Sequence, residues 1–138
     1  MAYLLDTCAV SDLWKPGPNR GLVAFFDAAA EDDLFLSVLS LGEIKTGIER
    51  LPAGKKKSTL GQHYQQLRAR FSSRVLPVTD VVAERWGVLD AEVSQRGLRL
   101  MAVDGLLAAT AILGSLTVVT RNVSDFDVTP APWVNPWS

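Results

Sequence analysis

Short apolar segments typical of buried strands alternate along the chain with longer segments whose apolar spacing is typical of helices. The predicted strands cover residues 3–5, 34–38, 75–78, 116–120 and 133–135. The predicted helices cover residues 22–30, 39–51, 55–71, 81–95 and 105–113, and a short helix precedes the loop at residues 15–19. Alternation of this kind favours parallel pairing with helices on both faces of the sheet. We therefore predict an α/β fold with a central parallel sheet of four to five strands, and an edge position for the strand containing Pro77, which has no N–H to donate.

Length and composition limit the organisation of the molecule. The 138 residues fit one compact domain, and no repeat or linker divides them, so a single domain over residues 1–138 is expected. The net charge of −1 excludes a polybasic nucleic-acid binder. Cys8 is the only cysteine, which excludes an internal disulfide and favours a reducing cytoplasm. No signal peptide is recognisable, and the longest apolar stretch, residues 106–119, is interrupted by polar residues, so no membrane association is expected.

Four acidic residues lie where predicted strands end or helices begin. Asp6 ends the first strand, Glu43 follows the second strand in the first turn of a helix, Asp104 opens a helix, and Asp125 follows the strand that ends at Thr120. Ligands of open α/β sheets bind beyond the carboxyl ends of the strands. Four separate segments thus offer carboxylates to one edge of the sheet.

Each acid also has a purely structural interpretation. Ser40 and Glu43 have the spacing of a capping box. Asp6 and Asp104 have the positions of helix N-caps, each worth about 1 kcal/mol, and Asp125 has that of a turn residue. No single acid therefore establishes a site, and the functional hypothesis depends on all four converging.

Convergence would place strongly repelling charges together, at about 1 to 4 kcal/mol per pair at contact distance. A hard divalent cation offsets such repulsion, and Mg²⁺ or Mn²⁺ prefers oxygen ligands. Phosphate is then the natural substrate group, because a metal in this position polarises a phosphoryl oxygen and activates water. Hydrolysis of a phosphate ester is the chemistry that follows.

Four motifs, in order, resemble PIN domains, in particular the bacterial toxin ribonucleases of the VapC and FitB type. The first two are Tyr3-Leu4-Leu5-Asp6-Thr7 and the stretch from Leu36 to Ile44. The others are the alanine-rich helix from Asp104 to Ala111 and the segment Thr120-Arg121-Asn122-Val123-Ser124-Asp125-Phe126. The ending Val134-Asn135-Pro136-Trp137 is similar to that of FitB-like members.

The resemblance implies a PIN-like three-layer sandwich over residues 1–138 and a Mg²⁺- or Mn²⁺-dependent endoribonuclease. It implies metal binding mainly through Asp6 and Asp104, with help from Glu43 and Asp125 in binding and catalysis. It also implies supporting hydrogen bonds from a set of polar residues: Thr7, Ser37, Thr120 and Asn122.

The same resemblance implies an RNA substrate, a cognate antitoxin that inhibits the toxin, a homodimer, and DNA contact only through the antitoxin. Arg121 adjoins the predicted site and is a candidate for binding RNA phosphate. An alternative function is a partner module that holds an antitoxin on DNA with weak or no nuclease activity. A phosphatase of the haloacid dehalogenase type is disfavoured because Cys8 stands where that family repeats its acid.

Several other residues are assigned structural roles. Cys8 replaces a polar residue of many PIN domains and is interpreted as a structural substitution, since thiols match Mg²⁺ poorly. His63 and the lysines at 55–57 are interpreted as solvated, and the four tryptophans, including Trp14, as packing residues. Asp127 is a possible substitute for Asp125.

Overall fold

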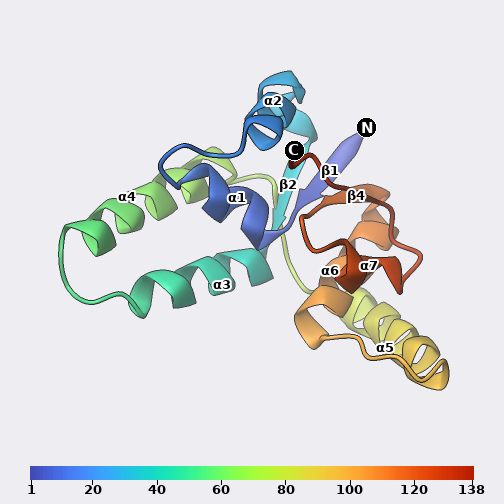
Figure 1. Cartoon of the computed structure of the whole chain (residues 1–138). Helices are drawn as coiled ribbons and strands as arrows, with labels where there is room; N and C mark the ends of the chain where they lie inside the picture. Colours follow the sequence, from blue (N-terminus) through green and yellow to red (C-terminus); the bar gives the residue numbers. More distant parts are fainter.

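The computed structural model describes all 138 residues around a five-stranded parallel sheet (Figure 1). The strands are β1 (Ala2–Leu5), β2 (Leu34–Ser37), β3 (Val75–Leu76), β4 (Leu116–Val119) and β5 (Trp133–Val134). Their order is β3-β2-β1-β4-β5, and every neighbouring pair is parallel. The predicted parallel sheet is confirmed with five strands, and the strand before Pro77 lies at an edge.

Seven helices flank the sheet. They are α1 (Thr7–Leu13), α2 (Arg20–Ala28), α3 (Val38–Glu49), α4 (Lys55–Arg70), α5 (Asp80–Gln95), α6 (Ala102–Gly114) and α7 (Val123–Asp127), with a 3₁₀ turn at Glu31–Asp33. In Figure 1, α1, α3 and α4 lie to one side of the strands and α5, α6 and α7 to the other. The predicted helices are confirmed with small shifts at their ends. Helix α7 was not predicted, because five residues are too few to show helical periodicity.

The core consists of two apolar clusters, one on each face of the sheet. Leu4 and Val118 point into the cluster under α5 and α6, whereas Leu5 and Val119 point into the cluster under α1 to α4. All four side chains are fully buried. Successive strand residues face opposite sides, and because helices cover both sides, the strands are apolar throughout. The clusters form the two interfaces of a three-layer sandwich.

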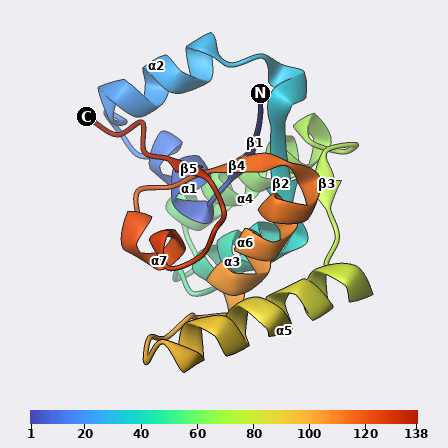
Figure 2. The same cartoon turned by 90° about the vertical axis from the view of Figure 1, so that its right-hand side faces the viewer.

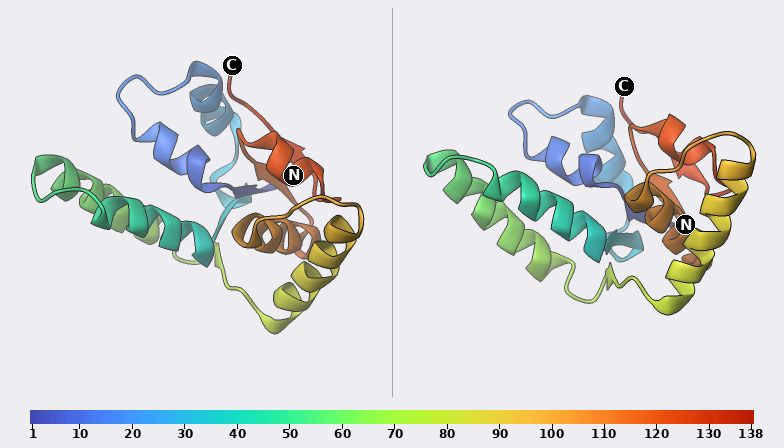
Figure 3. Two further views of the ribbon diagram at one scale, coloured as in Figure 1. Left: turned by 60° about the horizontal axis from the view of Figure 1, so that its bottom comes forward. Right: turned by 90° about the horizontal axis from the view of Figure 1, so that it is seen from below.

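The outer elements are arranged differently on the two faces. Figure 3 shows α3 and α4 as an antiparallel pair that projects away from the sheet. On the other face α5 packs across α6 (Figure 2). The last residues of the chain lie beside the start of α2, where the Asn19 side chain exchanges hydrogen bonds with Ser138 (Figure 2). No helix has the combination of length and apolar composition that crossing a membrane requires.

The strand order determines where a site can form. From the central strand β1, the chain continues outward through β2 and β3, and then returns to place β4 and β5 on the opposite side of β1. The connections leaving β1 and β4 therefore diverge, and this point of an open α/β sheet is where ligands bind. Asp6 and Thr120 are the first residues after these two strands.

Candidate acidic site

Asp6 is the most firmly held of the predicted acids. It caps α1, with Oδ1 accepting the Thr7 backbone N–H at 2.8 Å, while Oδ2 accepts the Thr120 hydroxyl at 2.8 Å. Asp6 is buried at 6% exposure, and Thr120 is completely buried. The Thr120 hydroxyl also accepts the Asn122 backbone N–H at 2.9 Å. Asp6 therefore caps α1 through one carboxylate oxygen while its other oxygen is held by Thr120 at the end of β4.

Cys8 lies against the same carboxylate. Its Sγ is 3.6 Å from Asp6 Oδ2 and 4.0 Å from the Thr120 hydroxyl. Burial raises the pKa of the thiol to about 11, and the Asp6 charge adds to this effect. At neutral pH the thiol is therefore protonated, and it acts as a weak hydrogen-bond donor to Asp6.

Glu43 reaches the site from α3. Its Oε1 accepts the Thr7 hydroxyl at 2.6 Å, so Thr7 joins two of the acids through its backbone N–H and its hydroxyl. The predicted capping box at Ser40 is wrong. Helix α3 begins at Val38, directly after β2, so Ser37 is the N-cap and Glu43 lies in the second turn. Glu43 consequently has no capping role and is available to the site.

Asp104 lies in the first turn of α6. The N-cap of this helix is Met101, so Asp104 is not the cap that its sequence position suggested. Its carboxyl is half-buried, and burial raises its pKa to about 6, with further contributions from the charges of Asp125, Asp6 and Glu43. The other three predicted acids therefore lie near enough to act on Asp104 electrostatically, although the four belong to separate segments.

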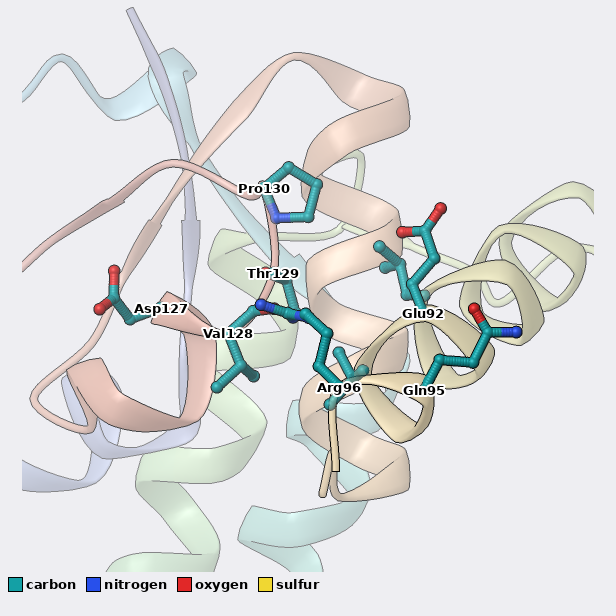
Figure 4. A pocket seen from close by; sticks show the side chains of 9 residues that line it. Glu92, Gln95, Arg96, Asp127, Val128, Thr129 and Pro130 are labelled. Carbon is teal, nitrogen blue, oxygen red and sulfur yellow. The ribbon is translucent and has the colours of Figure 1, made fainter. Parts of the chain in front are cut away.

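Asp125 lies in α7 rather than in a turn. Its neighbour Asp127 lines a different cavity, of about 610 Å³, between the C-terminal half of α5 and the segment after α7 (Figure 4). In that cavity Arg96 donates a hydrogen bond to the carbonyl oxygen of Val128. Asp127 is not among the charges that raise the pKa of Asp104. Of the two residues, Asp125 is the one whose charge acts on Asp104.

The predicted supporting residues divide into two groups. Thr7 and Thr120 donate hydrogen bonds to the acids. Ser37 does not contact the acids through hydrogen bonds, because its hydroxyl accepts the Leu39 N–H and caps α3. Asn122 takes part through its backbone N–H, and its side chain does not cap α7.

The donors suit a hard cation by their chemistry, since the acids and the two threonines offer only oxygen. In this structure no three acidic, histidine or cysteine side chains are arranged to hold one metal ion between them. Mg²⁺ is typically bound through one or two carboxylates, with water and substrate phosphate as its other ligands. The site therefore fits an ion bound by few protein ligands, rather than an ion enclosed by the protein.

Comparisons with known proteins identify the family. The model of the PIN domain family matches residues 3–131. The chain belongs to the PIN domain family. Among individual proteins similar to this PIN domain, toxin FitB from Neisseria gonorrhoeae is 35% identical over 135 residues, which cover 97% of both chains. VapC ribonuclease Y4jK from Sinorhizobium fredii is 31% identical over 135 residues, covering 97% of this chain and 96% of the relative.

A solved structure shows the same likeness in three dimensions. One chain of FitAB bound to an IR36 DNA fragment matches this PIN domain with a TM-score of 0.93 and 34% identity. The match covers 99% of this chain and 96% of the other. These comparisons confirm the resemblance to VapC and FitB toxins, which was recognised from the motifs around the four acids.

Asp12 is a residue of this PIN domain to which the sequence pattern alone gave no role. Its side chain is only 8% exposed, yet it accepts hydrogen bonds from Arg121 at 2.8 Å and Trp137 at 3.1 Å, and it pairs with Lys15 at 2.8 Å. These partners hold the pKa of Asp12 below its ordinary value despite the opposing effect of burial. The only sequence signal was the three-residue spacing of Asp12 and Lys15 at the end of the first helix. Asp12 therefore restrains Arg121, the predicted phosphate ligand, beside Thr120.

Proposed function

We propose that this VapC-type ribonuclease toxin is a metal-dependent endoribonuclease whose active site comprises Asp6, Glu43, Asp104 and Asp125. The observation that carries the proposal is the convergence of carboxylates from four segments at the ends of β1 and β4. Burial, and after it the charges of Asp125, Asp6 and Glu43, disfavour the ionised form of Asp104 in the folded chain and raise its pKa to about 6. A cation bound beside these carboxylates would offset the unfavourable ionisation of Asp104.

Asp6 and Asp104 are the proposed main ligands of Mg²⁺ or Mn²⁺. Asp6 is preorganised for this role, because Thr7 and Thr120 hold both of its oxygens in place. Asp104 comes from the opposite side of the sheet and is half-buried, so its charge is only partly screened by solvent. When bound, the metal would polarise a phosphoryl oxygen and lower the pKa of a water molecule.

The remaining carboxylates act on water in the proposed reaction. Glu43 is oriented by the Thr7 hydroxyl but has a second oxygen without a hydrogen bond, and Asp125 comes from the first turn of α7. Either carboxylate can orient the attacking water and accept its proton. The water oxygen forms a bond to phosphorus while one bridging P–O bond of the RNA breaks, and the leaving oxygen takes up a proton.

Cleavage of RNA by the purified chain tests this proposal. We expect cleavage of a single-stranded RNA with Mg²⁺ or Mn²⁺, and none with EDTA. Asp6→Asn and Asp104→Asn should each reduce the rate by at least about a hundredfold. Asp27→Asn, an exposed acid on α2 without an ion pair, makes the same change in charge and should cleave normally. Cleavage that persists in EDTA, or in both site variants, would contradict the proposal.

An antitoxin is the proposed protein partner. The similar FitAB structure is bound to DNA, whereas the present chain has a net charge of only −1. DNA contact through a second protein agrees with both facts, and a homodimer of the toxin in the cytoplasm is the proposed free state.

Expression of the chain alone should arrest growth, and Asp104→Asn should relieve the arrest. Unaffected growth, with DNA binding only beside a partner, would favour the alternative module without nuclease activity.

A further inference from the structure

A groove of about 410 Å³ adjoins the acidic site between α1 and the α3–α4 pair. It begins at Thr7 and Glu43, the two residues joined by the 2.6 Å hydrogen bond. Figures 1 and 3 show the three surrounding helices on the same side of the sheet. The volume falls within the range of sites that hold small organic groups. A molecule bound among the acids can therefore continue into this groove.

The walls of the groove suit a flat apolar group. Ile44, Ile48 and Leu60 form an aliphatic surface from α3 and α4. Trp14, at the end of α1, contributes an aromatic wall, and its ring is supported from α4 by His63, with ring centroids 5.6 Å apart. Tryptophan faces stack on nucleobases of any identity. An unstacked base thus finds both an aromatic and an aliphatic surface here.

The charged residues lining the groove differ from those of the acidic site. Besides Glu43, they are two lysines, Lys15 and Lys56. Lys15 is 62% exposed and pairs with Asp12, whereas Lys56 is exposed and makes no ion pair. Its neighbour Lys57 is already paired with Glu49. Lys56 is therefore free to meet an anionic group that enters the groove.

From this arrangement we infer that the groove is a subsite for one unstacked nucleotide of single-stranded RNA, next to the phosphate that is cleaved. Trp14 stacks on the base, and Lys56 contacts a neighbouring phosphate. The inference rests on the proposed hydrolysis at the acids, because that reaction places a phosphate beside Thr7 and Glu43. Apolar walls alone also suit a protein segment. The free lysine and the continuity with the acids favour an RNA nucleotide, which has both a base and a phosphate.

Binding of a short fluorescein-labelled single-stranded RNA, followed by anisotropy in the Asp104→Asn background, tests the subsite without cleavage. Gly47 lines the groove on α3, and an added Cβ there meets nothing within 4 Å. Gly47→Phe should therefore direct a ring into the groove without a clash at its Cβ, and weaken RNA binding by at least about fivefold. Gly87→Phe on α5 is the matched control, because it also has open space but lies on the other face of the sheet.

The proposed contact between Lys56 and a phosphate is tested by Lys56→Glu. It should weaken binding and lower the slope of log affinity against log salt by about 0.7, the value for one phosphate contact with a single strand. Lys55→Glu is the control with the same net charge, since Lys55 does not line the groove. Loss of RNA-induced tryptophan quenching in Trp14→Phe would identify the stacking partner.

The outcomes separate the subsite from the proposed reaction. If Gly47→Phe and Lys56→Glu weaken binding and their controls do not, the subsite is supported, even should the native chain fail to cleave RNA with Mg²⁺ or Mn²⁺. If neither variant changes RNA affinity, the subsite is overturned, whether or not cleavage occurs. A loss confined to binding of an antitoxin protein would also overturn it, by assigning the groove to a protein segment.

Discussion

Asp104→Asn should stabilise the metal-free chain at neutral pH, although the proposed function predicts that it removes nuclease activity. Burial raises the pKa of Asp104 to about 6, with Asp125, Asp6 and Glu43 contributing, from an ordinary value of 3.8. The folded chain therefore binds this proton more tightly than the unfolded chain does. Ionisation of Asp104 accordingly destabilises the folded state, fully above the folded pKa and not at all below the unfolded one.

The size of the effect follows from the change in pKa. About two pKa units correspond to roughly 3 kcal/mol at 1.36 kcal/mol per unit. Because Asp104 is only half-buried, solvent screening reduces this to about 1 to 1.5 kcal/mol. Asparagine has nearly the same shape without the charge, so Asp104→Asn should raise the free energy of unfolding by that amount at about pH 7.5. Near pH 4 the native carboxyl is largely protonated, and the gain should be small.

Urea denaturation in EDTA at both pH values measures this effect. Asp27→Asn is the control, because Asp27 is exposed and makes no ion pair, so its replacement should change stability by less than about 0.5 kcal/mol. Mg²⁺ should stabilise the native chain more than Asp104→Asn, since only the native site retains all four acids. An Asp104→Asn chain that is no more stable than the native chain at neutral pH would refute the argument that burial and the neighbouring acids disfavour ionised Asp104 in the folded chain.

Three further predictions concern contacts around the site and the chain end. Thr120→Val removes the hydrogen-bond donor to Asp6 and leaves the Asn122 N–H without its partner, so it should lower the free energy of unfolding, measured with urea, by about 2 kcal/mol. Thr117→Val, on the preceding strand β4, should lower it little. Gly21→Ala places a Cβ against the carbonyl oxygen of Pro136, which should displace the C-terminal residues and raise their hydrogen-exchange rates; unchanged exchange would contradict this packing. Hydrogen bonds from Arg70 and Arg74 lower the pKa of Glu31 to about 2, so Glu31 should contribute stability above pH 4.5 that is lost as the pH falls towards 2. Glu31→Gln should remove this part of the pH dependence of unfolding, and an unaltered pH profile would contradict the role of Glu31.

Local pattern was sufficient for most of the architecture. Strand and helix periodicities depend on residues close together in the chain. The parallel sheet, six of the seven helices and the edge position of the strand next to Pro77 therefore followed from the sequence. The positions of Asp6 directly after β1 and of Asp104 at the start of α6 also followed. Parallel strands bring their carboxyl ends to one edge, which is why acids distant in sequence were expected to meet.

Helix starts and side-chain partners were decided by the tertiary structure. Ser37, rather than Ser40, caps α3 because β2 runs directly into the helix, and this earlier start frees Glu43 for Thr7. Successive side chains of a helix differ in direction by about 100°. The residue at which a helix begins therefore determines which of the following side chains face a neighbouring element.

The pairing of Arg121 with Asp12 and the groove beside Trp14 were likewise absent from the sequence pattern. Each depends on the distance between segments that are far apart along the chain. The sequence by itself determined which chemical groups the molecule carries and at which strand ends they lie. Only packing of the two helical layers against the sheet decided which of those groups contact one another, because contact depends on separations in space that local periodicity does not contain.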